Sequence, residues 1–170
     1  PKKPDMVISG INAGPNVGPD ILYSGTVGAA TEAAHEDLPS IAVSHDCYKV
    51  KNGDLLPQAR HLVALAERID WSQLGRRRVV NVNYPACPLN EAKGLRVCPQ
   101  TSAVWVNTYS ERLDPRGAPY WWLEGEIPAE TIEPDSDKDM LNRGYITLTP
   151  LRFDFTDAAG LNALAGMKLG

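Results

Sequence analysis

Near its start the sequence reads Asp5-Met-Val-Ile-Ser9, followed by Gly10-Ile-Asn-Ala-Gly-Pro-Asn-Val-Gly18. The apolar run over 5–9 predicts a short strand, the glycine-rich stretch over 10–18 predicts a loop, and the small residues from Ser24 to Ala34 predict a helix. Ser40-Ile-Ala-Val-Ser44 then forms an apolar run after Pro39, as is typical of a parallel strand covered on both faces. Together these segments predict a βαβ unit.

Further segments continue the same alternation of strands and helices. Asp54 and Pro57 mark a helix start, and apolar residues then recur at intervals of three and four as far as Ile69. Arg78 to Tyr84 predicts a third strand, and Tyr145 to Thr149 predicts a last one. We therefore expect an α/β fold with a mostly parallel sheet in three layers.

The chain changes character between these last two strands. Residues 97–123 contain Trp105, Trp121 and Trp122 in two aromatic and β-branched runs around a turn-rich centre. We interpret them as a long β-hairpin arm that packs on another subunit, because adjacent tryptophans face opposite sides of a strand and both need apolar cover. The alternative is an edge hairpin packed on its own core. Residues 151–170 predict a C-terminal helical tail.

The composition excludes several classes of protein. The 170 residues carry a net charge of −4, and the acidic stretch over 124–143 alone holds seven acidic and two basic side chains. A broad basic face for a nucleic-acid duplex is therefore not expected. No apolar stretch is long enough to span a membrane. Cys47, Cys87 and Cys98 lack metal-ligand or disulfide spacing, which favours a cytoplasmic protein with free thiols.

The loop over 10–18 follows the carboxyl end of the first strand, where open α/β sheets bind ligands. It has neither the Gly-x-Gly-x-x-Gly spacing of a dinucleotide site nor the pattern of a P-loop. Asn12 and Asn16 each offer a neutral carbonyl oxygen, which suits Mg²⁺ or Mn²⁺ held together with carboxylates, water and a phosphate. The alternative is that both asparagines only accept left-handed turn conformations among glycines.

Ser24-Gly25-Thr26 stands directly before the small-residue helix. A hydroxyl side chain here can cap the helix, whose free N–H groups and dipole attract an anion, and Gly25 lets a phosphate approach closely. The alternative is that these hydroxyl side chains only cap the helix and bind no phosphate. His35, His45 and His61 lie where surface or packing roles are expected, although His45 follows the carboxyl end of a strand.

Longer blocks of the sequence resemble the SurE family, the stationary-phase survival proteins. The resemblance covers nearly the whole chain. Its blocks are Ser9 to Gly18, Tyr23 to Ala30, Pro39 to Ser44, Asn81 to Pro85, Asp114 to Gly117, Tyr120 to Trp122, Asp137, and Gly144 to Leu151.

The resemblance implies a Rossmann-like domain with a projecting hairpin exchanged between subunits, in a homodimer or homotetramer held by the arm and the tail. It also implies metal-dependent hydrolysis of nucleoside 5′- and 3′-monophosphates by a phosphomonoesterase. Asn12 matches the family's asparagine metal ligand, whereas Asn16 and Ser24-Gly25-Thr26 match positions that line the phosphate site. Asp20 lies in the same block. A role for Asp20 in capping the loop or a helix is expected as much as a role in the chemistry of the site.

The family pattern also includes an Asn-Asp-Asp-Gly motif whose aspartates bind the metal, and this sequence begins after it. We therefore expect residues 1–170 to be one incomplete α/β phosphatase domain. Its metal-binding carboxylates would lie upstream of Pro1, so the chain alone would hold no catalytic residue and show little or no activity. The competing hypothesis is a non-catalytic phosphate-binding or oligomerisation module. A third hypothesis is that the chain is a nucleotide-binding domain of a larger enzyme, but the sequence contains no cofactor-binding motif that would support it.

Overall fold

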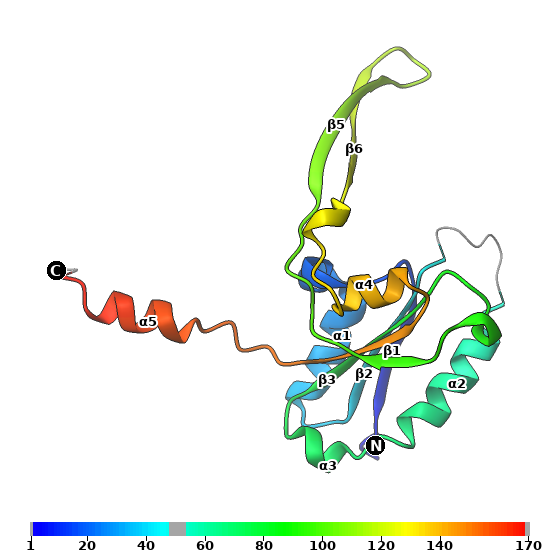
Figure 1. The fold of residues 1–170 in the computed structure, drawn as a ribbon, viewed down its shortest axis with the longest axis vertical. Helices are drawn as coiled ribbons and strands as arrows, with labels where there is room; N and C mark the ends of the chain where they lie inside the picture. Colours follow the sequence, from blue (N-terminus) through cyan, green and yellow to red (C-terminus); the bar gives the residue numbers. More distant parts are fainter. Residues whose placement is uncertain (1, 48–53, 169–170) are drawn as a thin grey trace.

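A five-stranded sheet forms the centre of the chain (Figure 1), in a computed structural model that describes residues 2–47 and 54–168. The strand order is β1-β2-β3-β7-β4. Strands β1, β2 and β3 are parallel, β7 is antiparallel to β3, and β4 is parallel to β7. The strands are β1 (Val7–Ala13), β2 (Ser40–His45), β3 (Val79–Tyr84), β4 (Leu95–Val97) and β7 (Ile146–Leu151).

Helices cover both faces of the sheet, so the predicted α/β fold in three layers is confirmed. Helix α1 (Gly25–His35) buries Val27, Ala30 and Ala34 against one face. Helix α2 (Leu56–Ala66) packs on the other face, where the short helix α3 (Trp71–Leu74) joins the same apolar cluster. None of the helices in the described residues is long and apolar enough to cross a membrane.

Strand β3 is fully buried, but its two faces differ in chemistry. Val80, Val82 and Tyr84 belong to the apolar cluster under α2. Because side chains alternate along a strand, Asn81 and Asn83 point to the opposite face, the one that α1 covers. The α1 side of the sheet is therefore apolar near the amino end of β3 and polar toward its carboxyl end.

Strand β1 runs to Ala13 and so extends beyond the predicted end at residue 9. Gly10 allows this extension, because it adopts a φ of +132° and lies against β2. A Cβ atom at this position would lie 2.2 Å from the carbonyl oxygen of Val43, a backbone atom that cannot move aside. The glycine is thus needed for the pairing of β1 with β2.

Short elements complete the chain around this core. Three of them are 3₁₀ helices and one is an α-helix of six residues. They are η1 (Gly18–Tyr23), η2 (Leu89–Glu91), η3 (Ala129–Thr131) and α4 (Asp137–Asn142).

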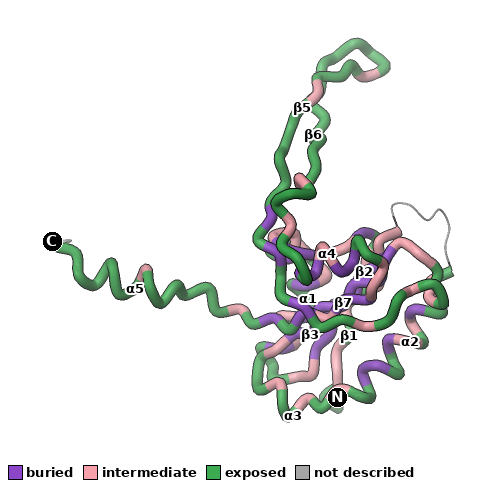
Figure 2. The backbone as a smooth tube through the Cα atoms, in the orientation of Figure 1, coloured by how far each residue is buried: buried purple, intermediate pink, exposed green. Residues whose placement is uncertain are grey.

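The predicted hairpin arm exists, but its boundaries differ from the expected 97–123. Strands β5 (Val106–Leu113) and β6 (Pro119–Glu126) form a separate two-stranded sheet that projects from the domain (Figure 1). Val97 instead ends β4, which pairs with β7 in the main sheet. Both faces of the arm are exposed along its length (Figure 2). The alternative of an edge hairpin packed on its own core is therefore wrong for this structure.

The carboxyl-terminal segment leaves the domain as an extended chain that ends in helix α5 (Ala158–Ala165) (Figure 1). The predicted tail began at Leu151, which instead closes β7, and the last two residues of the predicted range lie outside the described residues. Helix α5 buries no residue (Figure 2). Its exposed apolar side chains have no cover within the described chain, among them Leu161 and Leu164.

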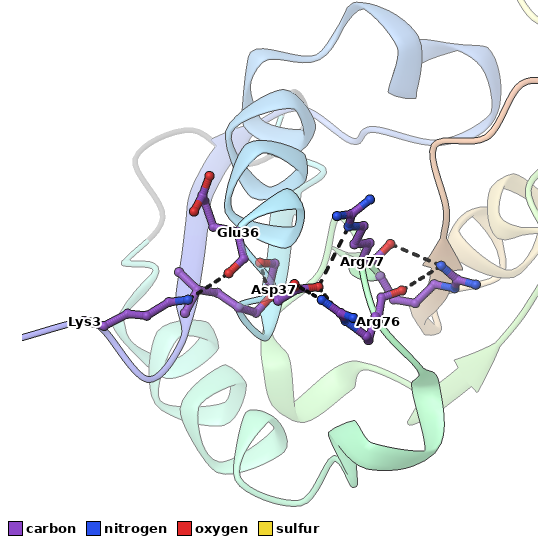
Figure 3. Close-up of polar contacts among 8 residues, drawn as sticks. Lys3, Glu36, Asp37, Arg76 and Arg77 are labelled. Carbon is purple, nitrogen blue, oxygen red and sulfur yellow. Dashed lines mark hydrogen bonds and ion pairs between the residues drawn. The ribbon is translucent and has the colours of Figure 1, made fainter.

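The end of α1 is tied to the turn before β3 by surface charges (Figure 3). Asp37 pairs with the guanidinium of Arg76, and the Nε of Arg77 lies 3.9 Å from its Oδ1. Lys3 Nζ donates to the backbone oxygen of Glu36 at 2.9 Å. The guanidinium of Arg76 holds the pKa of the Asp37 carboxyl below its usual value. Because these groups are exposed, solvent screens the pairs and they add little to stability.

Candidate functional site

The loop after β1 lies at the edge of the sheet where the parallel strands β1, β2 and β3 end. This edge is also where α1 begins, because a helix that connects two parallel strands starts at their carboxyl ends. Asn12, Asn16 and Ser24 are thereby brought to one edge of the sheet. The sequence had predicted this arrangement from the βαβ pattern.

Asn12 lies near the end of β1, opposite Ser44 of β2, and is half-buried. Its Nδ2 donates to the backbone oxygen of Gly14 at 2.8 Å. This bond fixes the side-chain amide and directs its nitrogen to the loop, so the carbonyl oxygen Oδ1 remains as an acceptor. An amide oxygen of this kind is a suitable ligand for Mg²⁺ or Mn²⁺.

Asn16 is buried and links the loop to the strands beneath it. Its Nδ2 donates to Ser44 Oγ at 2.7 Å, and its backbone N–H donates to Asn83 Oδ1 at 2.8 Å. Its backbone oxygen accepts from Asn81 Nδ2 at 2.8 Å and from Asn83 Nδ2 at 3.0 Å. Asn16 therefore holds the loop in place, and a direct contact between its side chain and phosphate stays a prediction.

Ser24 is the N-cap of α1, and its Oγ accepts a hydrogen bond from Val27 N at 3.2 Å. The N–H groups of Gly25 and Thr26, one and two residues later, have no hydrogen-bond partner among the described residues. Gly25 is exposed, and a Cβ atom added to it would meet nothing within 4 Å. The start of α1 thus presents free donors to an open space, where the helix dipole favours an anion.

Asp137 is fully buried and holds the end of the loop. Its Oδ2 accepts from Gly18 N at 2.9 Å, and its Oδ1 accepts from Thr101 N at 2.9 Å and from Lys138 N at 2.8 Å. Burial raises the pKa of this carboxyl, and the three N–H donors partly offset that effect. A Cβ atom at Gly18 would lie 2.6 Å from Thr101 Cγ2. The close approach of the Gly18 backbone to Thr101 and Asp137 therefore favours glycine at this position.

Three buried residues support the site from below, and the sequence predicts no role for any of them. Asn81, Asn83 and Thr101 are buried and bond to the loop or to Asp137. One signal was available, because asparagines at alternate positions of an otherwise apolar strand mark a face that needs polar partners.

His45 does not belong to this polar face. It follows Ser44 on β2, so its side chain lies on the α2 side of the sheet. It is 2% exposed, and neither ring nitrogen bonds to a described residue. Burial lowers the pKa of His45, while the charge of Asp46 opposes this shift. The expected packing role fits this position better than a role at the phosphate site.

Within residues 2–47 and 54–168, no group of three or more histidine, cysteine or acidic side chains could hold a metal ion. Asn12 is thus the candidate ligand that this part of the chain contributes, and it supplies only one oxygen. Asp20 lies in η1, where burial raises the pKa of its carboxyl and the indole of Trp105 donates to its Oδ1 at 3.1 Å.

Comparisons with known proteins agree on one family. The family model described as "Survival protein SurE" matches residues 1–107. The chain is 74% identical to "5'-nucleotidase SurE" of Desulfovibrio desulfuricans, over 99% of the chain and 67% of that relative. It is 59% identical to "5'-nucleotidase SurE" of Nitratidesulfovibrio vulgaris strain Miyazaki F, over 98% of the chain and 61% of that relative.

A solved structure supports the same fold. The crystal structure of the SurE protein from Aquifex aeolicus matches with a TM-score of 0.75 and 32% sequence identity, over 96% of this chain and 65% of that chain. The present chain therefore spans about two thirds of the length of the relatives that it matches.

The support of Asn16 by β3 can be tested with Asn83→Ala. The substitution leaves the buried N–H of Asn16 without its acceptor, so we expect the free energy of unfolding to fall by about 1–3 kcal/mol. Denaturant unfolding followed by circular dichroism measures this change. The exposed Asn90→Ala serves as the matched control and should stay within about 0.5 kcal/mol of the parent. Equal effects of the two variants would contradict the supporting role.

The burial of His45 predicts a pH dependence of stability. The folded chain resists protonation of this ring, whereas the unfolded chain takes up the proton near pH 6.5, the ordinary value. The neutral, buried His45 ring therefore makes its full contribution to the free energy of unfolding above about pH 6.5. This contribution is lost as the pH falls below that value. Between about pH 7.5 and about pH 5.5, we expect the free energy of unfolding to drop less in His45→Gln than in the parent. The exposed His35→Gln should retain the parent's drop, and an unchanged slope in His45→Gln would refute the assignment.

Proposed function

The chain belongs to the SurE family, and from this premise we propose that the protein hydrolyses nucleoside 5′-monophosphates, and 3′-monophosphates as well, to a nucleoside and inorganic phosphate. The relatives named 5'-nucleotidase support this activity. The observation that carries it is the open start of α1, where the free N–H groups of Gly25 and Thr26 lie at the same sheet edge as Asn12.

The start of α1 would bind the phosphate group. The two free N–H groups donate to phosphate oxygens, and the absence of a side chain at Gly25 allows the close approach that these bonds need. The Ser24 hydroxyl already accepts a bond from Val27, so its own proton is available for donation to a phosphate oxygen. These donors orient the phosphate and offset the charge that develops on it during hydrolysis.

Asn12 would hold the divalent cation, Mg²⁺ or Mn²⁺, through Oδ1. When bound, such an ion polarises the phosphate and lowers the pKa of a coordinated water. Asn12 contributes one neutral oxygen, and its bond to Gly14 keeps that oxygen in place. We further propose that the remaining ligands are carboxylates from outside this chain. Residues 1–170 alone would then bind the ion weakly and release little phosphate.

Two features support the proposal that the protein forms a homodimer or homotetramer. The arm exposes Trp121 by 64% and Trp122 by 51%, and the tail exposes the apolar side chains of α5. Isolated two-stranded hairpins are marginally stable in water, and large exposed apolar patches mark interaction sites. A second copy of the chain that packs on the arm and the tail would cover both. We also propose a cytoplasmic location, because Cys47, Cys87 and Cys98 are free thiols.

The metal role of Asn12 is tested with Asn12→Ala in the complete protein. We expect Mn²⁺-dependent release of phosphate from AMP to fall by at least about tenfold, because the cation loses a ligand oxygen. Thermal unfolding should stay close to that of the parent, and the exposed Asn90→Ala should keep full activity. Undiminished turnover in Asn12→Ala would exclude the metal role. If the parent protein releases no phosphate from nucleoside monophosphates, the nucleotidase proposal is wrong, and the assembly module remains.

The assembly through the arm is tested with the double variant Trp121→Ser, Trp122→Ser. Light scattering after size exclusion should give the parent at two or four times the chain's 18.5 kDa and the variant at a lower mass. Arg116→Ala, in the turn between β5 and β6, is the control and should leave the mass unchanged. A parent that runs as a monomer at all concentrations would contradict the proposal.

A further inference from the structure

A cavity of about 250 Å³ lies at the edge of the sheet opposite the candidate functional site. Its lining comes from the end of α1, the turn before β3 and the segment after β7, and consists of His35, Arg77, Arg78, Arg152, Phe153 and Asp154. We propose that this cavity binds a phosphate group, either as the free inorganic ion or at the end of a phosphomonoester. The inference does not depend on the proposed nucleotidase function.

The pairing of two strands brings arginines from distant parts of the chain together. Strand β3 begins at Val79 and β7 ends at Leu151, and these two residues are partners in the antiparallel register. Arg78 directly precedes the first residue of this pair, and Arg152 directly follows the second. Both arginines therefore lie at the amino end of β3. The candidate functional site lies at its carboxyl end, about 20 Å away along the six residues of the strand.

The two arginines have like charges and no acidic partner. Like charges on neighbouring positions of paired strands destabilise a sheet. Neither Arg78 nor Arg152 forms an ion pair within the described part of the chain. Arg78 Nη1 donates to the backbone oxygens of Arg76 at 2.8 Å and of Arg77 at 3.3 Å, which holds its guanidinium beside the turn. An anion between the two guanidinium groups would replace their repulsion by attraction.

Arg77 adds a third guanidinium to the cavity. Its backbone adopts a φ of +56°, in the left-handed region that residues other than glycine rarely occupy. Its Nε lies 3.9 Å from Asp37 Oδ1, but Asp37 is paired more closely with Arg76. The two terminal nitrogens of Arg77 have no hydrogen-bond partner among the described residues. They remain as donors for a ligand.

The other polar groups of the cavity leave an excess of positive charge. Asp154 Oδ1 accepts from Thr156 N at 3.0 Å, and this bond lowers the pKa of the Asp154 carboxyl. Asp154 therefore supplies one negative charge against three guanidinium groups. His35, in the last turn of α1, offers a further ring N–H donor. In a chain whose net charge is −4, this local excess of positive charge favours an anion at this edge.

The donors and the size of the cavity point to a phosphate group. Guanidinium groups bind phosphate through two parallel N–H···O bonds. A tetrahedral phosphate offers oxygens in several directions and can therefore contact three arginines, whereas a carboxylate offers only two oxygens in one plane. The cavity is smaller than most sites for larger ligands, which span about 300–1,000 Å³. The phosphate group alone therefore fits it better than a whole nucleotide.

The experiment titrates the complete protein with inorganic phosphate by calorimetry, in EDTA so that no metal-bound phosphate contributes. We expect the parent to bind one phosphate per chain that the double variant Arg77→Gln, Arg152→Gln loses. The dissociation constant at this site should rise at least about tenfold, because two of the three guanidinium groups are removed. Both residues are exposed, so circular dichroism should show an unchanged fold. Arg60→Gln, at an exposed arginine of α2, is the matched control and should bind phosphate like the parent.

Equal stoichiometry and affinity in the parent and the double variant would overturn the proposal. So would phosphate binding that about 0.15 M NaCl abolishes, because screening of this kind indicates a diffuse field and no built site. A titration with ribose 5-phosphate distinguishes the two sources of the phosphate group. Binding of this ester that needs the same arginines supports a phosphomonoester as ligand, and binding of inorganic phosphate alone supports the free ion. A protein that hydrolyses no nucleotide but shows this loss would refute the nucleotidase function and keep the phosphate site.

Discussion

The backbone N–H and the backbone carbonyl oxygen of Asn16 are held by two asparagine side chains of β3, and the candidate site depends on these contacts. Asn83 accepts from the Asn16 N–H, and both Asn81 and Asn83 donate to its carbonyl oxygen. Upstream of this point the loop connects to Asn12, and downstream it leads through Gly18 and η1 to the start of α1. The buried amides thus fix, through one loop, the distance between the candidate metal ligand and the candidate phosphate donors. Asp137 fixes the far end of the loop in the same way.

Much of this arrangement could be predicted from the sequence because its signals are local. Short apolar runs placed β2 and β3, and Ser24 before a run of small residues placed the start of α1. Asn12 was expected at the carboxyl end of β1, because parallel strands and their connecting helices share one edge. These features depend on residues that lie close together along the chain, so periodicity and capping patterns report them directly.

The remaining features depend on contacts between distant segments. Asp137 meets Gly18 across more than a hundred residues, and no local pattern pairs a carboxylate with a particular loop. The sequence predicts too early a start for the arm, because Val97 is apolar in either setting and only its pairing with β7 assigns it to the main sheet. Strand β1 likewise continues through Gly10. The sequence pattern predicts a loop at this glycine, and only its close approach to Val43 assigns it to the strand. That residues 1–170 form one incomplete domain stays a prediction.

The two chemically different faces of β3 have a consequence for how the chain finds its native pairing. A shift of β3 by one residue against β2 would turn every side chain to the opposite face. Asn81 and Asn83 would then enter the apolar cluster under α2 with no partners, while Val80 and Val82 would face the loop. The first change buries amide groups without hydrogen bonds, and the second removes apolar side chains from the core. Each change destabilises the sheet with the shifted register. The asparagines that hold the loop therefore also specify the register of β3 against β2. The geometry of the candidate site can form only in a chain that has adopted this register.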